Sequence, residues 1–330
     1  MSLMSVRANV EHVYRWDLDK TYLETDFDSV RGLVKTALEP AVNKRAVPGA
    51  KALLNAIAQD NPGSKIVILS GSPTQMRQVL EEKLRLDGVR FDELRLKDNL
   101  GNLRRGRLRA VSHQMGYKLP ALLQGRVGAR AVVHETLFGD DAEQDALVYA
   151  LYADLVSGLV DETECAEILR AAGAYRDEVD AAIAALRRID PSSAIDRVYI
   201  HLSRPRAPKR FEALSEHVIP IHSHFQAGVL EFARERLSPA GLVSVAEGVL
   251  SRGRHPVHLA NLLQDLGRRS WLDRGLEARL MAVDGLHTLI AAFRSRWEGV
   301  ICDAPRKQRP RTVDYLALLP SFERRTARNS

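Results

Sequence analysis

The sequence has little cysteine, few aromatic residues and no long hydrophobic run. Two cysteines, Cys165 and Cys302, stand far apart in 330 residues, without the spacing of metal ligands, which argues against a disulfide framework. No signal peptide precedes the first predicted strand, so we expect reduced thiols in a cytoplasmic protein. The longest apolar stretch, 147–160, carries Asp154 and falls short of the roughly 18 residues that a membrane helix needs. We therefore expect a soluble protein.

The overall composition is that of a folded protein with a basic surface. Hydrophobic residues make up 45% and charged residues 27% of the chain, which excludes a disordered protein. The formal charge of +6 favours an anionic partner, such as a phosphate ester, a nucleic acid or an acidic membrane surface. A solvated basic surface is the alternative. The composition alone does not choose between them.

Strand-like and helix-like segments alternate along the first half of the chain. This alternation predicts an α/β fold, in which a parallel sheet is connected by crossover helices. Strands are expected at 13–17, 66–70, 131–138, 197–202 and 217–221. Helices are expected at 49–60, 73–86, 142–159, 161–172 and 176–188, at a short segment from 118, and beyond residue 225, where 276–297 reads as one amphipathic helix.

These segments suggest a division of the chain. We expect a catalytic core at 8–160, a helical insertion at 161–190 and a return to the core sheet at 191–237. A helical region at 238–302 and a basic tail at 303–330 follow. Ligands bind at the carboxyl ends of strands in open α/β sheets, so functional residues are expected there.

Carboxylates gather at two such strand ends. Asp17 and Asp19 lie two positions apart just past a strand, so both side chains can reach one small volume. In that arrangement Asp17 can attack phosphorus while Asp19 moves a proton. The second group, Asp140, Asp141 and Asp145, follows another predicted strand. The pairing indicates phosphoryl transfer.

Four motifs in order resemble the haloacid dehalogenase superfamily of aspartate-nucleophile phosphatases. The first is WDLDKT, and the second is Ser70 at the end of IVILS, followed by Gly71 and Ser72. The third is a lysine, best matched by Lys118, with Lys97 as the competing residue. The fourth is LFGDDAEQD. The resemblance implies a Rossmann-like three-layer α/β/α sheet with a helical insertion and a helical C-terminal region.

The same resemblance implies roles for these residues. Asp17 would be the nucleophile and Asp19 the acid and base, while Lys118 would neutralise charge at the nucleophile. A magnesium ion would be bound by oxygen ligands from Asp17, Asp19, Asp140 and either Asp141 or Asp145. Phosphate contacts would come from Ser70, Thr21, Gly71 and Ser72.

Basic residues outside the four motifs are further candidates for substrate contact. Arg204, His222 and His224 follow predicted strands. For the two histidines the alternative is that Ser223 caps a helix and that His222 and His224 have no role in substrate binding. His134, inside a predicted strand, is expected to be a core histidine. The segment 97–109 holds Lys97 and four arginines, and could bind a lipid phosphate, a polyanion or a nucleic-acid backbone. A solvated basic hairpin is the alternative.

The spacing of the motifs leaves little room for a cap domain. Between Thr21 and Pro48 lie 26 residues, and between Pro73 and Lys118 lie 44. An open site suits a bulky, lipid-like or macromolecular phosphate ester. Over 13–149 the chain looks most like the family that includes actin-patch phosphatidate phosphatases. A non-catalytic scaffold of the same fold and a phosphatase acting on nucleic-acid ends are the alternatives.

Overall fold

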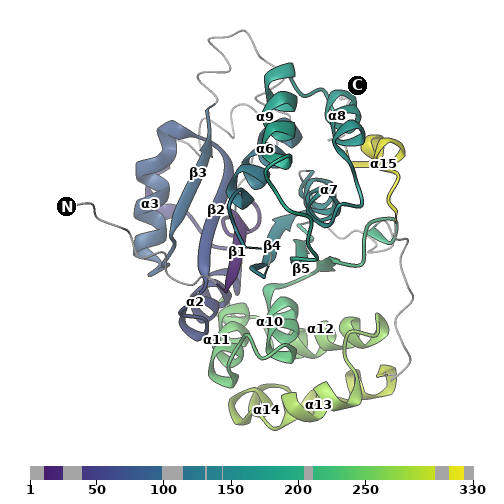
Figure 1. The fold of residues 1–330 in the computed structure, drawn as a ribbon. Helices are drawn as coiled ribbons and strands as arrows, with labels where there is room; N and C mark the ends of the chain where they lie inside the picture. Colours follow the sequence, from purple (N-terminus) through teal and green to yellow (C-terminus); the bar gives the residue numbers. More distant parts are fainter. Residues whose placement is uncertain are drawn as a thin grey trace, which may run out of the picture.

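A six-stranded, all-parallel sheet forms the centre of the molecule. The computed structural model describes residues 11–24, 39–98, 114–130, 132–142, 144–203, 211–301 and 312–322. The strands follow the order β3-β2-β1-β4-β5-β6, with helices on both faces (Figure 1). Their bounds are β1 His12–Asp17, β2 Lys65–Pro73, β3 Glu93–Lys97, β4 His134–Asp140, β5 Ile195–His201 and β6 Val218–Ile221. The expected three-layer α/β/α fold is confirmed.

The central strand β1 lies between β2 and β4, and this order sets the position of the acidic residues. Asp17 is paired with Leu69 of β2, and Trp16 is paired with Phe138 of β4. Because all three strands are parallel, their carboxyl ends meet at one edge of the sheet. The residues that follow them are therefore neighbours in space.

Two hydrophobic cores lie on the two faces of the sheet because successive strand residues alternate. On one face Tyr14 and Trp16 pack with α2 Ala50–Asp60, α3 Arg77–Leu86 and α10 His224–Ala233. On the other, Leu69 and Leu137 pack with α6 Met115–Arg126, α7 Asp145–Ser157, α8 Glu162–Ala171, α9 Arg176–Leu186 and α15 Tyr315–Phe322. The helices expected at 161–172 and 176–188 are confirmed as α8 and α9.

The C-terminal helices form a layer outside α2 and α10 (Figure 1). They are α11 Pro239–Leu250, α12 Val257–Arg268, α13 Arg274–Met281 and α14 Asp284–Ile290. The prediction of one helix over 276–297 is wrong. Val283 has an extended backbone (φ −87°, ψ 101°) that separates α13 from α14, and the chain then tightens into the 3-10 helix η4, Ala291–Arg296.

One strand was missed by the sequence analysis, and the expectation for one histidine was wrong. The strand β3 was not predicted, although Leu94 and Leu96 alternate with charged residues and point into the core. His134 is not a core histidine: it begins β4, its side chain is 45% exposed, and it lies 3.0 Å from Asp196. Arg95 and Lys97 interrupt the apolar pattern of β3, and charged residues of this kind are tolerated at the edge of a sheet.

A buried ion-pair network fixes α6 to the sheet. Glu135 of β4 accepts hydrogen bonds from Arg15 (2.6 and 3.0 Å), Arg126 (3.1 Å) and Tyr152 (2.8 Å), and all four side chains are buried. Burial opposes the charged form of Glu135, but the two arginines outweigh it and hold its pKa below the usual range. Arg126 ends α6, so this network holds the helix that carries Lys118.

The remaining described segments are short or peripheral. Three more 3-10 helices are η1 Ala41–Asn43, η2 Thr74–Met76 and η5 Glu298–Val300. The tail helix α15 docks on the body, where the Tyr315 hydroxyl donates a hydrogen bond to Asp154. Within the described ranges, no helix has both the length and the apolar character to cross a membrane.

Candidate functional site

Three buried aspartates converge at the carboxyl edge of the sheet. Asp17 ends β1, Asp140 ends β4 and Asp145 begins α7, and each is fully buried. One carboxylate oxygen from each lies within 4.8 Å of the other two. Three carboxylates so close together repel one another unless cations lie among them. A hard divalent cation that prefers oxygen ligands fits this set.

A tight turn after β1 positions the next two polar residues. The amides of Tyr22 and Leu23 both donate to the Leu18 carbonyl, at 3.1 and 2.8 Å. Lys20 has a φ of 61°, a conformation that lysine rarely adopts, and the ring nitrogen Nδ1 of His201 lies 3.1 Å from its carbonyl oxygen. This turn brings the Thr21 hydroxyl back onto Asp17 Oδ2, to which it donates at 3.1 Å.

Asp19 accepts hydrogen bonds from two hydroxyl groups of β2. Ser70 and Ser72 both donate to Asp19 Oδ2, at 2.8 and 3.0 Å, and the Ser72 amide donates to Ser70 Oγ at 3.0 Å. The chain at Ser70 bulges out of regular register with β3, which lets both serines face the same carboxylate. Asp17 and Asp19 therefore occupy distinct environments two residues apart.

Lys118 supplies a positive charge at the centre of the acidic group. Its ammonium donates to Asp17 Oδ1 at 2.7 Å and to Asp145 Oδ1 at 2.5 Å, and its side chain is fully buried. Lys97, the competing candidate, lies 5.7 Å from the centre of the Tyr117 ring. Of the two lysines, the structure brings Lys118 to Asp17.

The loop after β4 separates the two acids that the sequence left as alternatives. Asp145 lies in the acidic group, and its Oδ2 accepts from the Asp140 amide at 3.3 Å. Asp141 instead accepts from the amide and hydroxyl of Ser203, at 2.8 and 2.7 Å. A Cβ at Gly139 would lie 2.7 Å from Asp145, so only glycine lets α7 approach β4 this closely.

Gly71 is confined by a glutamine that sequence reasoning missed. A Cβ at Gly71 would lie 2.5 Å from the side-chain nitrogen of Gln114, which immediately precedes α6. The sequence gives no signal for this contact because 42 residues lie between Gly71 and Gln114. The close approach fixes the start of the lysine-bearing helix against the serine loop.

His222 and His224 do not join the acidic group. His224 is fully buried, with its ring 5.9 Å from Trp16 and 5.1 Å from His201, and burial holds its pKa well below 6.5. His222 has a side chain that is 36% exposed and lies 4.0 Å from Asp265. Ser223 caps α10, as expected, by accepting from the amide of Phe225 at 3.3 Å. Arg204 lies outside the described residues, as do the four arginines of 97–109.

A lysine that sequence reasoning did not single out lies near the turn that carries Asp19. Lys44 follows η1, and its side chain is only 2% exposed. The negative charge of Asp19 acts on it, together with that of Glu39. No sequence motif marks this residue, because the backbone pairing that brings it to Asp19 is visible only in three dimensions.

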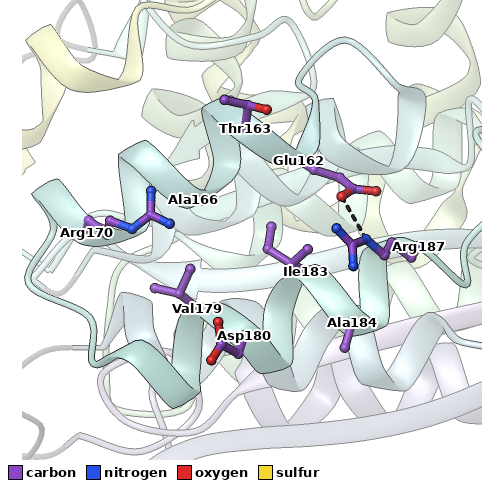
Figure 2. A pocket seen from close by; sticks show the side chains of 9 residues that line it. All are labelled: Glu162, Thr163, Ala166, Arg170, Val179, Asp180, Ile183, Ala184 and Arg187. Carbon is purple, nitrogen blue, oxygen red and sulfur yellow. Dashed lines mark hydrogen bonds and ion pairs between the residues drawn. The ribbon is translucent and has the colours of Figure 1, made fainter.

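A groove of about 500 Å³ lies between α8 and α9, and its lining does not include Asp17, Asp140 or Asp145 (Figure 2). Val179 and Ile183 line it from α9, and an ion pair of 2.8 Å joins Arg187 and Glu162 at one end. None of its lining residues comes from the strand ends that carry the aspartates. It does not contribute to the candidate site.

No family model, no curated protein and no solved structure matches the chain.

Proposed function

We propose that the protein is a magnesium-dependent phosphomonoester hydrolase that works through an aspartyl-phosphate intermediate on Asp17. The observation that carries the proposal is that the carboxylates of Asp17 and Asp19 have different hydrogen-bond partners. Asp17 is bound to the Lys118 ammonium beside two other aspartates, while Asp19 is bound to two hydroxyls. A nucleophile and a separate proton carrier need environments as different as these.

The residues present fit a magnesium ion. Asp17, Asp140 and Asp145 would hold it, since they offer three buried carboxylate oxygens close together. The bound ion would supply positive charge that screens the phosphate from the anionic nucleophile. The main-chain carbonyl of Asp19 is a further expected ligand. Asp141 is not proposed as a ligand, because the group of close carboxylate oxygens comes from Asp17, Asp140 and Asp145.

The chain's own residues then carry the two steps of hydrolysis. Asp17 attacks phosphorus, the bond between phosphorus and the ester oxygen breaks, and Asp19 gives its proton to the leaving alcohol. In the second step Asp19 takes a proton from water, whose oxygen attacks phosphorus and releases Asp17 and inorganic phosphate. Lys118 neutralises Asp17 in both steps, and Ser70 and Ser72 hold Asp19 in position.

The substrate is proposed to be a bulky or lipid-like phosphate ester. Support comes from the short spacing between the motifs, which leaves no room for a large cap. Parts of both spacers, 25–38 and 99–113, lie outside the described residues. The basic charge of the chain favours an anionic substrate of this kind.

Phosphate release from a panel of esters tests the proposal. The panel includes phenyl phosphate, phosphatidate and end-phosphorylated oligonucleotides, each with magnesium and with EDTA. We expect magnesium-dependent release by the wild type and none by Asp17→Asn. Asp180→Asn, on the exposed surface of α9, is the matched control and should retain full activity. Full activity of folded Asp17→Asn would show that the nucleophile assignment is wrong.

A further inference from the structure

Lys44 is a buried cation that the proposed mechanism does not use. Its side chain is 2% exposed, and an ammonium is costly to bury unless negative charge lies nearby. Lys51 and Lys65, by contrast, have side chains that are 49% and 39% exposed. Unlike these exposed lysines, Lys44 is not stabilised by water, so its charge must be stabilised by groups of the protein.

The backbone places Lys44 next to the turn that carries Asp19. The amide of Glu24 donates to the Arg45 carbonyl at 2.8 Å, and the amide of Val47 donates to the Tyr22 carbonyl at 2.7 Å. Isolated bridges join Leu23 both to Ala46 and to Asp19. Residues 44–47 therefore run along one edge of the segment at Leu23, and Asp19 lies along its other edge.

Two carboxylates act on the Lys44 ammonium. Glu39 is 3.9 Å away, beyond hydrogen-bond distance, and its side chain is 40% exposed. Asp19 is the second, and it is 4% exposed. Burial lowers the pKa of Lys44, and both carboxylates oppose that shift. The ammonium thus shares a buried environment with the carboxylate that is proposed to move the proton.

The geometry of phosphoryl transfer indicates which part of the substrate lies near Lys44. In an in-line displacement the nucleophile and the leaving oxygen lie on opposite sides of phosphorus. Asp17 and Lys118 are on the nucleophile's side, whereas Asp19 must reach the leaving oxygen. A cation beside Asp19 therefore lies near the alcohol part of the ester. There it offsets the repulsion between Asp19 and any negative group on that alcohol.

We propose that Lys44 determines specificity by selecting phosphomonoesters whose alcohol carries a second anionic group, a carboxylate or a phosphate, close to the ester oxygen. This inference rests on the proposed function, since it uses Asp19 as the residue that protonates the leaving group. It adds to the proposed function a class of substrate, esters with a second anionic group, that the four motifs do not specify.

Matched ester pairs test the inference with Lys44→Met, which keeps the length of the side chain and removes its charge. The carboxylate pair is 2-phosphoglycerate and glycerol 2-phosphate. The phosphate pair is ethane-1,2-diyl bisphosphate and 2-hydroxyethyl phosphate. We expect the wild type to prefer the anionic member of at least one pair. Lys44→Met should lower kcat/KM for that member by about 10- to 100-fold, the range for one charge-assisted hydrogen bond, and leave the neutral member within about twofold.

Two further variants test whether the effect depends on the charge and on the position of Lys44. Lys44→Arg keeps the charge and should retain the preference, whereas Lys51→Met, at an exposed lysine of α2, should behave as the wild type. If Lys44→Met does not fold, Lys44→Gln carries the same expectation. The pair that shows the preference decides between a carboxylate and a phosphate as the second group.

The outcomes separate this inference from the proposed function. Equal losses for both members of each pair would overturn the inference, because Lys44 would then act on Asp19 or on the fold rather than on the alcohol. An unchanged preference in Lys44→Met would overturn it as well, while inactive Asp17→Asn would leave the hydrolase proposal standing. Hydrolysis of none of the four esters by the wild type would overturn the inference, while magnesium-dependent release from phosphatidate or an oligonucleotide would leave the hydrolase proposal standing.

Discussion

Removing the charge of Lys118 should destabilise the protein and at the same time make its stability depend strongly on magnesium. The Lys118 ammonium lies 2.7 Å from Asp17 and 2.5 Å from Asp145, and all three side chains are fully buried. In Lys118→Met the two carboxylates face each other without that cation. Breaking a buried ion pair by removing one partner costs about 3–5 kcal/mol, because the remaining charges lose their compensation.

Magnesium should reverse much of that loss. The ammonium occupies one oxygen of Asp17 and one of Asp145, so in the wild type it competes with a metal ion for both. Lys118→Met frees these oxygens, and we expect it to bind magnesium more tightly than the wild type does. At a magnesium concentration of 100 times its Kd, binding contributes about 2.7 kcal/mol to the free energy of unfolding.

The assay is urea unfolding of both proteins in EDTA and in a magnesium titration. Lys83→Met is the matched control, since it removes a lysine of α3 that is also buried and is paired with Asp87 at 3.0 Å. Its response to magnesium should equal that of the wild type. If Lys118→Met is as stable as the wild type in EDTA, or responds no more strongly to magnesium, the electrostatic reasoning about this site is refuted.

Two further predictions concern packing and pH. Gly139→Ala should lower the free energy of unfolding by about 1–3 kcal/mol and weaken magnesium binding, measured by calorimetry, because its Cβ would lie 2.7 Å from Asp145. Burial raises the pKa of Asp154 from 3.8 to about 6, so its stabilising contribution is present below pH 4 and is lost as pH rises through 6. Relative to Asp154→Asn, the wild type should lose about 3 kcal/mol over that range in urea titrations; parallel curves would refute this.

The sequence predicted the layers of the fold because hydrophobic periodicity is a local signal. Apolar runs at β1 and β2, and the alternation of strands with helices, are enough to predict a parallel sheet with its loops at one edge. The errors arose where the local signal was ambiguous. The edge strand β3 carries Arg95 and Lys97 among its leucines, and the break at Val283 follows no proline or glycine.

The sequence predicted that acidic residues would cluster at the sheet edge, but not which side chains would be in contact. The spacing of Asp17 and Asp19 and the acids after β4 predicted a cluster, and the strand order brings Asp17, Asp140 and Asp145 together. The choice of Asp145 over Asp141 in this cluster depends on a hydrogen bond to Ser203, 62 residues away. Lys44 depends on a backbone pairing with the turn at 18–23. Such contacts between distant residues have no counterpart in a local pattern.

The most direct test of the account is to trap the intermediate on Asp17. The protein is mixed with phenyl phosphate labelled with radioactive phosphorus, in the presence of magnesium, and quenched in acid within milliseconds. Peptide mapping then locates the label. We predict label on the peptide that contains Asp17, no label in EDTA, and none in Asp17→Asn. Steady release of phosphate with no label on that peptide, together with full turnover by Asp17→Asn, would contradict the account.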